Sequence, residues 1–254
     1  MDYLNVAEAR EKPGLRLVLT AGLPGPWGEA IKSILAFKGI PFQPVAQLAG
    51  DENAALVEWT GQASAPVIVF NDEPPRVSWL DQLMLAERLV PERTLLPAGL
   101  DQRALVIGLC REVAGENGLG WLRRLELLGP GIGDGTANEQ SMRMARRYGW
   151  SPETFAKATP AALALLRGFC ARILGQRQAG SDYLVGDALS AADLYLANFI
   201  GMYYPLPEAL NPMPSYLREV YSRRTGEQDA VLEAGLLGYR DTIVKRHIRT
   251  PMTF

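Results

Sequence analysis

The stretch that decides the fold is YLVGDALSAADL, residues 183–194. Its centre reads Ser-x-x-Asp, from Ser190 to Asp193, which is the pattern of a helix N-terminal capping box. In such a box the Ser190 hydroxyl accepts the N–H of Asp193, and the Asp193 carboxylate accepts the N–H of Ser190. Leu189 and Leu194 are spaced to pack over this start as a hydrophobic staple. The stretch therefore predicts a buried helix that begins after Ser190.

Outward from this helix, the sequence changes character near position 90. Residues 15–90 alternate strand and helix patterns in the order β-α-β-α-β-β-α, and residues 1–14 precede them as a polar arm. Residues 91–99 form a linker. Residues 100–254 carry long helical patterns and no convincing strand. The sequence thus predicts a small α/β domain followed by an all-helical domain.

The composition limits the chemistry that the chain can perform. Its 254 residues include 26 Lys+Arg and 28 Asp+Glu, for a net charge of −2, which gives no electrostatic reason to expect nucleic-acid binding. The single histidine, His247, excludes a multi-histidine metal site. Cys110 and Cys170 each lie in an apolar helical stretch, which favours buried thiols over a disulfide or a nucleophile.

The sequence also bears on the compartment. No secretory signal pattern opens the chain. The longest mostly apolar run, Leu194–Pro207, is too short to cross a bilayer. Two lone cysteines suit a reducing environment. We therefore expect a cytoplasmic protein without a membrane partner.

Three local matches resemble the cytosolic glutathione transferase superfamily, and together they extend over nearly the whole chain. GPWG at 25–28, followed by FKGIPF at 37–42, is similar to the opening of the family's small domain. APVI at 65–68 is similar to the family's strand with a cis-proline, and residues 183–194 are similar to a buried helix of its C-terminal domain. The resemblance implies a thioredoxin-like α/β N-terminal domain and an all-α C-terminal domain.

The resemblance also implies a glutathione site in the small domain. Ala65 would pair its backbone with the cysteinyl part of glutathione, beside a cis peptide bond at Pro66. Asp81 and Gln82 would hold the γ-glutamyl end at a helix N-terminus, which favours a carboxylate. Gln62 would hold the glycyl end. The residues alone leave two alternatives open, which are a trans proline that begins a strand and a solvated helix start at Asp81.

The position that the family uses for catalysis is altered. Family members carry a Tyr, Ser or Cys near the first turn, because an attacking thiol must be a thiolate. The residue before Pro26 is Gly25 in this chain. Thr20 offers a hydroxyl, Trp27 could shape the pocket, and backbone N–H groups at the helix start could stabilise a thiolate. The alternative is a non-catalytic binding or interaction module that has lost this step.

In the helical domain, Asn117, Trp121 and Arg124 recur at helical spacing. The resemblance implies that this region holds the second substrate, a small hydrophobic electrophile, and the alternative is a packing patch. The same segment contains three glycines that would each cost a helix about 1 kcal/mol, which indicates a close approach or a helix break at Gly115, Gly118 and Gly120. The resemblance further implies a homodimer and no bound metal.

Overall fold

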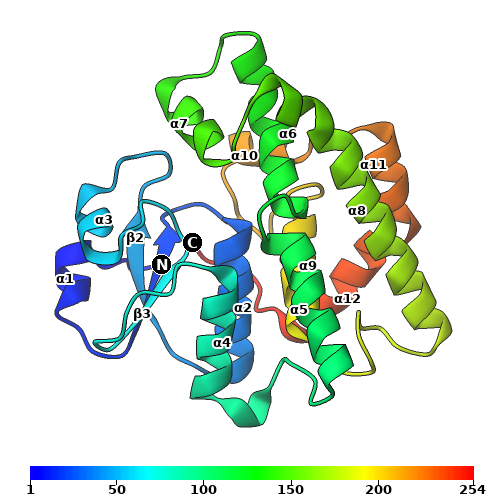
Figure 1. The fold of residues 1–254 in the computed structure, drawn as a ribbon, viewed down its shortest axis with the longest axis horizontal. Helices are drawn as coiled ribbons and strands as arrows, with labels where there is room; N and C mark the ends of the chain where they lie inside the picture. Colours follow the sequence, from blue (N-terminus) through cyan, green and yellow to red (C-terminus); the bar gives the residue numbers. More distant parts are fainter. The chain divides into compact units, whose positions relative to one another are not determined.

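The computed structural model describes residues 1–254, and they form two compact units (Figure 1). Unit 1 contains Met1–Thr94, Pro207–Pro214 and His247–Phe254, and unit 2 contains Leu95–Leu206 and Ser215–Arg246. The boundary falls inside the linker predicted at 91–99. The expectation of one unbroken helical domain from residue 100 to 254 is wrong, because two short segments of this part belong to unit 1.

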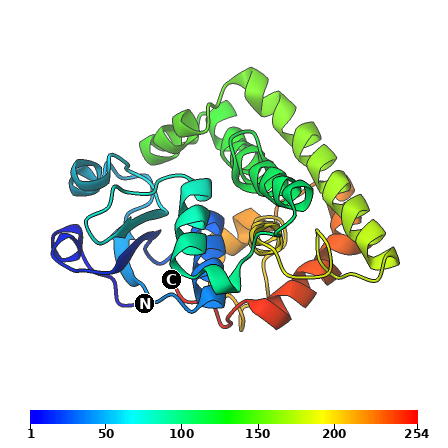
Figure 2. The ribbon, with the colours of Figure 1, turned by 60° about the horizontal axis from the view of Figure 1, so that its bottom comes forward.

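Contacts within unit 1 explain why the end of the chain belongs there. The N–H of Met252 donates to the carbonyl of Leu210 at 2.8 Å, which joins the two returning segments. Lys32 donates to the carbonyl of Thr253 at 2.5 Å, and its ammonium lies 6.0 Å from the centre of the Phe254 ring. Both termini consequently lie side by side in unit 1 (Figures 1 and 2).

Unit 1 is a three-stranded sheet with helices on both faces. Its elements are α1 Val6–Arg10, β1 Leu15–Thr20, α2 Pro26–Lys38, β2 Gln43–Gln47, α3 Ala54–Thr60, β3 Val67–Phe70, α4 Trp79–Leu89 and the 3-10 helix η1 Pro91–Arg93. The strand order is β2-β1-β3, with β1 parallel to β2 and antiparallel to β3. Helices α1 and α3 cover one face, and α2 and α4 cover the other (Figures 1 and 2).

Two features of unit 1 differ from the sequence prediction. The polar arm at 1–14 contains α1, which is capped by Asn5, and Leu4 forms a parallel bridge with Val45 of β2. The predicted fourth strand is reduced to one bridge between Ile68 and Arg76. A proline has no N–H to donate to a sheet, so the Pro-Pro pair before Arg76 limits this pairing.

Helix α2 forms as its sequence predicts. Gly25 is the N-cap, Pro26 takes the first turn, and Gly39 ends the helix with a left-handed φ of 72°. A Cβ on Gly28 would lie 2.9 Å from a methyl carbon of Leu19, so the helix packs closely on β1. This close packing places the start of α2 directly beside the end of β1.

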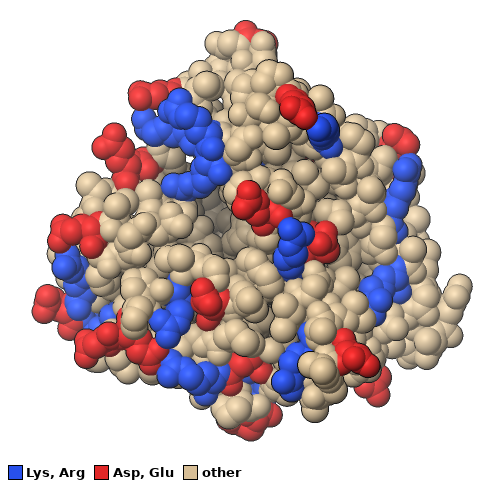
Figure 3. Space-filling view, viewed as in Figure 1, with Lys and Arg blue, Asp and Glu red and all other residues tan.

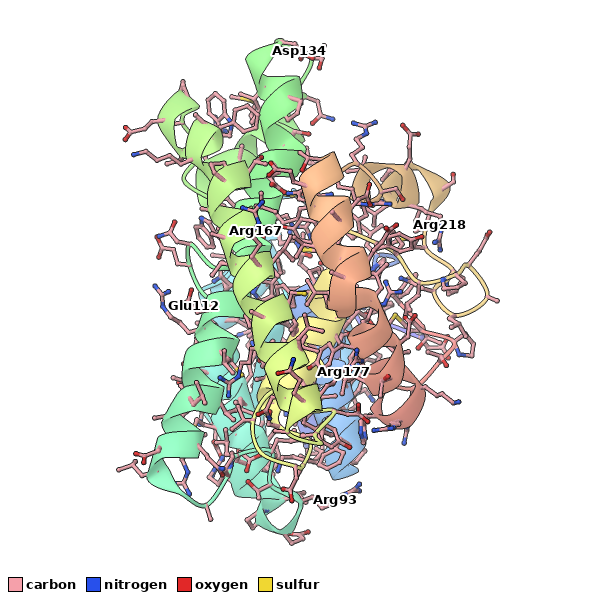
Figure 4. The ribbon with its side chains drawn as sticks, turned by 90° about the vertical axis from the view of Figure 1, so that its right-hand side faces the viewer. Arg93, Glu112, Asp134, Arg167, Arg177 and Arg218 are labelled. Atoms are coloured by element: carbon pink, nitrogen blue, oxygen red, sulfur yellow. The ribbon has the colours of Figure 1, made fainter.

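Unit 2 is entirely helical. Its elements are α5 Leu100–Ala114, α6 Leu119–Gly133, α7 Glu139–Arg147, α8 Pro152–Gln178, α9 Ala191–Ile200, α10 Ser215–Tyr221, α11 Gly226–Val231, the π-helical turn η2 Leu232–Leu236 and α12 Leu237–His247. All of α9 is buried, as the capping-box stretch predicts, and it packs against α5. Figure 4 shows α8 beside α11, with Arg167 on their outer surface, where it pairs with Glu227 at 2.9 Å.

The glycine-rich segment between α5 and α6 is a helix break. A Cβ on Gly115 would lie 2.7 Å from the carbonyl oxygen of Arg111, and one on Gly118 would lie 2.7 Å from that of Glu112. Asn117 between them has a left-handed φ of 60°. The chain therefore breaks at Gly115 and Gly118, between the end of α5 at Ala114 and the start of α6 at Leu119, as the glycines predict.

Helix α8 is long and apolar enough, by length and composition, to cross a membrane. The run Leu194–Pro207, which the sequence singled out, is not the longest apolar segment. One such helix is a weak sign of a membrane, since the core helix of a soluble protein passes the same test. Within unit 2, α8 packs against α6, α11 and η2.

Two glycines in unit 2 give a matched prediction about packing. A Cβ on Gly129 of α6 would lie 2.2 Å from the ring of Phe155, whereas Gly108 of α5 has open space around it. Overpacking costs about 1–3 kcal/mol, and alanine gains about 1 kcal/mol in a helix. Urea denaturation is therefore expected to show that Gly129→Ala lowers the free energy of unfolding and Gly108→Ala raises it. Equal effects of the two variants would contradict the packing of α6 on α8.

Candidate functional site

One end of the unit 1 sheet gathers most of the predicted site residues. Because β1 and β2 are parallel, their last residues, Thr20 and Gln47, are register partners at the same edge. Strand β3 runs the opposite way and begins at this edge with Val67. Helix α2 also starts here, after the short turn that follows Thr20. Three segments that lie apart in the sequence therefore meet at this edge. They are the turn from β1 to α2, the end of β2 and the start of β3.

The segment that enters β3 contains the predicted cis bond, between Ala65 and Pro66. Ala65 carries a backbone N–H and C=O that make no hydrogen bond within the protein. The carbonyl of Pro66, by contrast, accepts from the Gln82 side chain at 2.9 Å. One backbone donor and one backbone acceptor are thus left at the sheet end, where a peptide-like ligand can pair with them.

Gln82 does not have the role that its position suggested. Its side chain is buried, with 1% of the residue exposed. Its Nε2 donates to the carbonyls of Pro66 at 2.9 Å and Arg76 at 3.1 Å, which uses both N–H groups. The prediction that Gln82 donates to glutathione is therefore wrong, and the residue instead ties the first turn of α4 to the cis-proline segment.

Asp81 lies on the exposed side of the same turn. The N-cap of α4 is Ser78, whose hydroxyl accepts from the N–H of Asp81 at 3.0 Å and donates to its Oδ2 at 2.7 Å. The other carboxylate oxygen of Asp81 makes no bond within the protein. The sequence could have identified Ser78, since Ser78 to Asp81 repeats the Ser-x-x-Asp pattern of residues 190–193.

The hydroxyl of Thr20 is engaged inside the protein. It donates to Oε1 of Gln47 at 2.8 Å, and Nε2 of Gln47 donates onward to the carbonyls of Leu48 and Ala63 at 2.6 and 3.2 Å. A hydroxyl has one proton, so in this arrangement Thr20 has none to give to a thiolate. Gln47 is the organising residue that sequence reasoning missed; the only signal was a polar side chain at the end of a buried strand.

The start of α2 carries no side-chain cap, because the N-cap is Gly25. Its φ and ψ of −67° and 123° are extended values that any residue adopts, and nothing lies within 4 Å of a Cβ placed there. Trp27 in the first turn is half-buried. One turn further, Glu29 pairs with Lys32 at 2.8 Å, and burial raises the pKa of Glu29. The helix start therefore offers backbone polarity rather than a functional side chain.

Gln62 lies between α3 and the cis-proline segment. Its backbone is fixed by Thr60, whose hydroxyl accepts from the Gln62 N–H at 3.3 Å. Its half-buried side chain makes no hydrogen bond within the protein. The amide consequently keeps its donors and acceptor for another molecule.

In unit 2 the structure brings together two of the three predicted pocket residues. Trp121 and Tyr148 meet edge to face with ring centres 4.9 Å apart. The guanidinium carbon of Arg124 lies 5.7 Å from the centre of the Tyr221 ring, and the phenols of Tyr221 and Tyr148 raise the pKa of Arg124. Asn117 is exposed in the break before α6 and takes no part in this cluster. Tyr148 and Tyr221 were missed because they lie elsewhere in the sequence, at the C-cap of α7 and in α10.

The predicted cap at α9 is present and is part of a larger network. Oδ2 of Asp193 accepts from the N–H of Ser190 at 2.8 Å and from its hydroxyl at 2.7 Å. Oδ1 accepts from the N–H of Leu184 at 2.7 Å and from the hydroxyl of Tyr239 at 2.8 Å. Asp193 therefore fixes the preceding loop and the C-terminal helix α12 as well as its own helix.

Comparison with known proteins supports this architecture. Residues 142–219 match the family profile described as the glutathione S-transferase C-terminal domain. No curated protein matches the chain. Solved structures resemble it along nearly its whole length, and the match to 142–219 together with this shared fold confirms the resemblance seen in the sequence.

Three of these structures illustrate the likeness. A glutathione S-transferase from Methylobacterium radiotolerans, in complex with glutathione sulfonate, has a TM-score of 0.62 and 15% identity over 94% of this chain and 97% of its own. One from Methylobacillus flagellatus, with glutathione bound, has a TM-score of 0.62 and 13% identity over 92% and 96%. A rice enzyme in complex with glutathione has a TM-score of 0.60 and 16% identity over 95% and 94%.

Proposed function

We propose that this chain, whose fold is that of the glutathione transferases, binds glutathione at the sheet end of unit 1. The observation that carries the proposal is the unused backbone N–H and C=O of Ala65 beside the cis bond to Pro66. This pair suits the cysteinyl part of glutathione. Asp81 accepts from the γ-glutamyl ammonium, and Gln62 holds the glycyl end.

We further propose that the chain transfers or exchanges the glutathione thiolate on a small hydrophobic electrophile, with Trp121 and Arg124 contacting that second substrate. The thiolate would be stabilised by backbone N–H groups at the uncapped start of α2, aided by the helix dipole. Neither Thr20 nor Gly25 supplies a donor side chain. The remaining rate advantage would come from holding the two reactants together.

A second function is favoured by one specific observation. Gly25 stands where the family carries a catalytic side chain, and the proton of the nearby Thr20 hydroxyl goes to Gln47. A protein of this kind could bind glutathione without activating it and act as a binding module. The two functions differ in the thiol pKa of bound glutathione, which only the enzyme needs to lower.

Calorimetric titration with glutathione tests the binding proposal. We expect saturable binding by the whole chain, and a loss of about tenfold in affinity for Asp81→Asn, since a hydrogen bond to a charged group is worth about 1.5–3 kcal/mol. Asp72→Asn, which alters an exposed acid in a turn of the same unit, serves as the matched control. No binding at millimolar glutathione would refute both functions.

A substitution at Gly25 tests the catalytic proposal. The extended backbone and the open space at this position accept a side chain, and serine is a favoured N-cap. Gly25→Ser is expected to lower the thiol pKa of bound glutathione and to raise kcat/KM with 1-chloro-2,4-dinitrobenzene roughly tenfold, because one aligned donor has effects of that size or larger. Ultraviolet absorbance of the thiolate and steady-state rates are the measurements.

Two control variants accompany this test. Gly25→Ala adds a Cβ without a hydroxyl and is expected to match the parent protein. Thr20→Val removes a hydroxyl whose proton already goes to Gln47, so the thiol pKa of bound glutathione should stay unchanged. Equal rates for the Ser and Ala variants would count against a thiol located at the start of α2.

We also propose that the protein is a cytoplasmic homodimer, as the resemblance to the family implies. Sedimentation equilibrium of the full chain gives the oligomeric state directly. A monomer at all concentrations would remove the dimer from the proposal without affecting glutathione binding.

A further inference from the structure

Arg124 is a cation with no carboxylate partner. The side chain is largely enclosed, its Nε atom is buried without any hydrogen bond, and no acid lies within ion-pair distance. The nearest aromatic group is Tyr221, whose ring centre lies 5.7 Å from the guanidinium carbon, and the phenols of Tyr221 and Tyr148 both act on its pKa. Burial lowers the pKa of Arg124, but the two phenols raise it by a larger amount, so the group remains charged. Neutral phenols bind this charge without neutralising it.

The acids that could neutralise Arg124 are already used. The only acid of α6, Glu126, accepts from Arg123 at 2.9 Å and from Gln228 at 2.8 Å, so both of its oxygens are engaged. On α7, Glu139 pairs with Arg143, and on α10, Glu219 pairs with Arg223. The three helices that surround the cluster therefore supply no counter-charge.

The neighbouring surface of unit 2 adds positive charge. Arg146 and Arg147 are exposed at the end of α7, immediately before Tyr148, and neither forms an ion pair. Figure 3 shows basic side chains gathered over α7 on the face viewed there. This concentration is local, since the whole chain has a net charge of −2. A positive field around an enclosed guanidinium attracts small anions.

Aromatic rings flank the same cation. Trp121 and Tyr148 contact each other edge to face at 4.9 Å, and the ring of Tyr221 lies beside the guanidinium. A planar guanidinium presents a fork of donors that matches a carboxylate or a sulfonate. Tyr221 is buried, and the half-buried rings of Trp121 and Tyr148 provide apolar surface for a flat molecule that carries such a group.

We propose that Arg124, Tyr148 and Trp121 form a binding site for the carboxylate or sulfonate group of a small aromatic acceptor. The guanidinium binds the anionic group, and the rings contact the aromatic body. The role of this site in binding the second substrate rests on the proposed function, and it narrows the substrate class from hydrophobic electrophiles to anionic aromatic ones. The binding of an aromatic anion itself depends only on residues of unit 2.

The test compares two probes of nearly equal shape, 4-nitrobenzoate and 4-nitrobenzamide, by calorimetry on the full chain without glutathione. The parent protein is expected to bind the carboxylate at least tenfold more tightly than the amide. Arg124→Gln should abolish this preference, and Arg124→Lys should retain part of it because the charge remains. Arg167→Gln, which removes an exposed cation on α8, is the matched control and should change nothing.

The outcomes separate this inference from glutathione binding. Equal affinity of the parent for both probes overturns the site, and so does an unchanged preference in Arg124→Gln. If Arg124→Gln weakens glutathione and leaves nitrobenzoate unaffected, the anion held there is a carboxylate of glutathione, which also overturns the acceptor site. If glutathione fails to bind and the nitrobenzoate preference persists, the proposed function fails and the site stands. The comparison of the two probes on the parent protein tests the site even if the variants fail to fold.

Discussion

Replacing Asp193 by alanine is expected to lower the free energy of unfolding by about 3–5 kcal/mol, because several buried donors lose their acceptor at about 1–3 kcal/mol each. Asp193 is completely buried and accepts four hydrogen bonds of 2.7–2.8 Å from Leu184, Ser190 and Tyr239. The variant would leave two backbone N–H groups and two hydroxyls without an acceptor, and each unsatisfied buried donor costs about 1–3 kcal/mol.

Chemical denaturation of the full chain, followed by circular dichroism, measures this loss. Asp187→Ala changes an exposed aspartate of the preceding loop and is expected to stay within about 0.5 kcal/mol of the parent. Tyr239→Phe removes only one of the four bonds and should cost less than Asp193→Ala. A loss near 1 kcal/mol, which is the usual cost of a simple cap, would mean that the contacts to Leu184 and Tyr239 add no stability.

The same residue shows how far the sequence leads. The spacing of Ser190 and Asp193 was sufficient to predict the start of the helix and its cap, because both residues lie within one turn. The bonds to Leu184 and Tyr239 could not be predicted, since they depend on how a loop and a distant helix pack around α9. Sequence spacing therefore predicts the hydrogen bonds within one helical turn, but not those to residues that approach through tertiary packing.

The candidate glutathione site follows the same division. The cis bond before Pro66 and the helix that begins at Pro26 were predicted from short motifs. The hydrogen bonds that occupy the Thr20 hydroxyl and the Gln82 amide were not predicted. Their acceptors, Gln47 and the Pro66 carbonyl, come close only through sheet pairing and helix packing. Sequence reasoning found which segments make the site but not which side chains remain available to a ligand.

The second large effect is expected at Lys38, in the FKGIPF stretch at the end of α2. Its side chain is fully buried, and its ammonium pairs with Glu87 at 2.9 Å and donates to the carbonyls of Val90 and Arg93 at 2.8 and 2.9 Å. One cation therefore fixes α2, the end of α4 and the 3-10 turn η1. Lys38→Met is expected to destabilise unit 1 by about 3–5 kcal/mol, because the Glu87 carboxylate stays largely buried without its partner.

Native-state hydrogen exchange with mass spectrometry tests this expectation locally as well as globally. Exchange should accelerate in the last turn of α4 and in η1, while the amides of α9 in unit 2 serve as an internal reference. Lys12→Met changes an exposed lysine of the same unit and should leave exchange unaltered. Adding Glu87→Gln to Lys38→Met should restore part of the stability, since it removes the unpaired charge itself. If the double variant is no more stable than Lys38→Met, the Glu87 carboxylate is hydrated in the single variant. That result would contradict the expectation that Lys38→Met leaves a buried, unpaired charge.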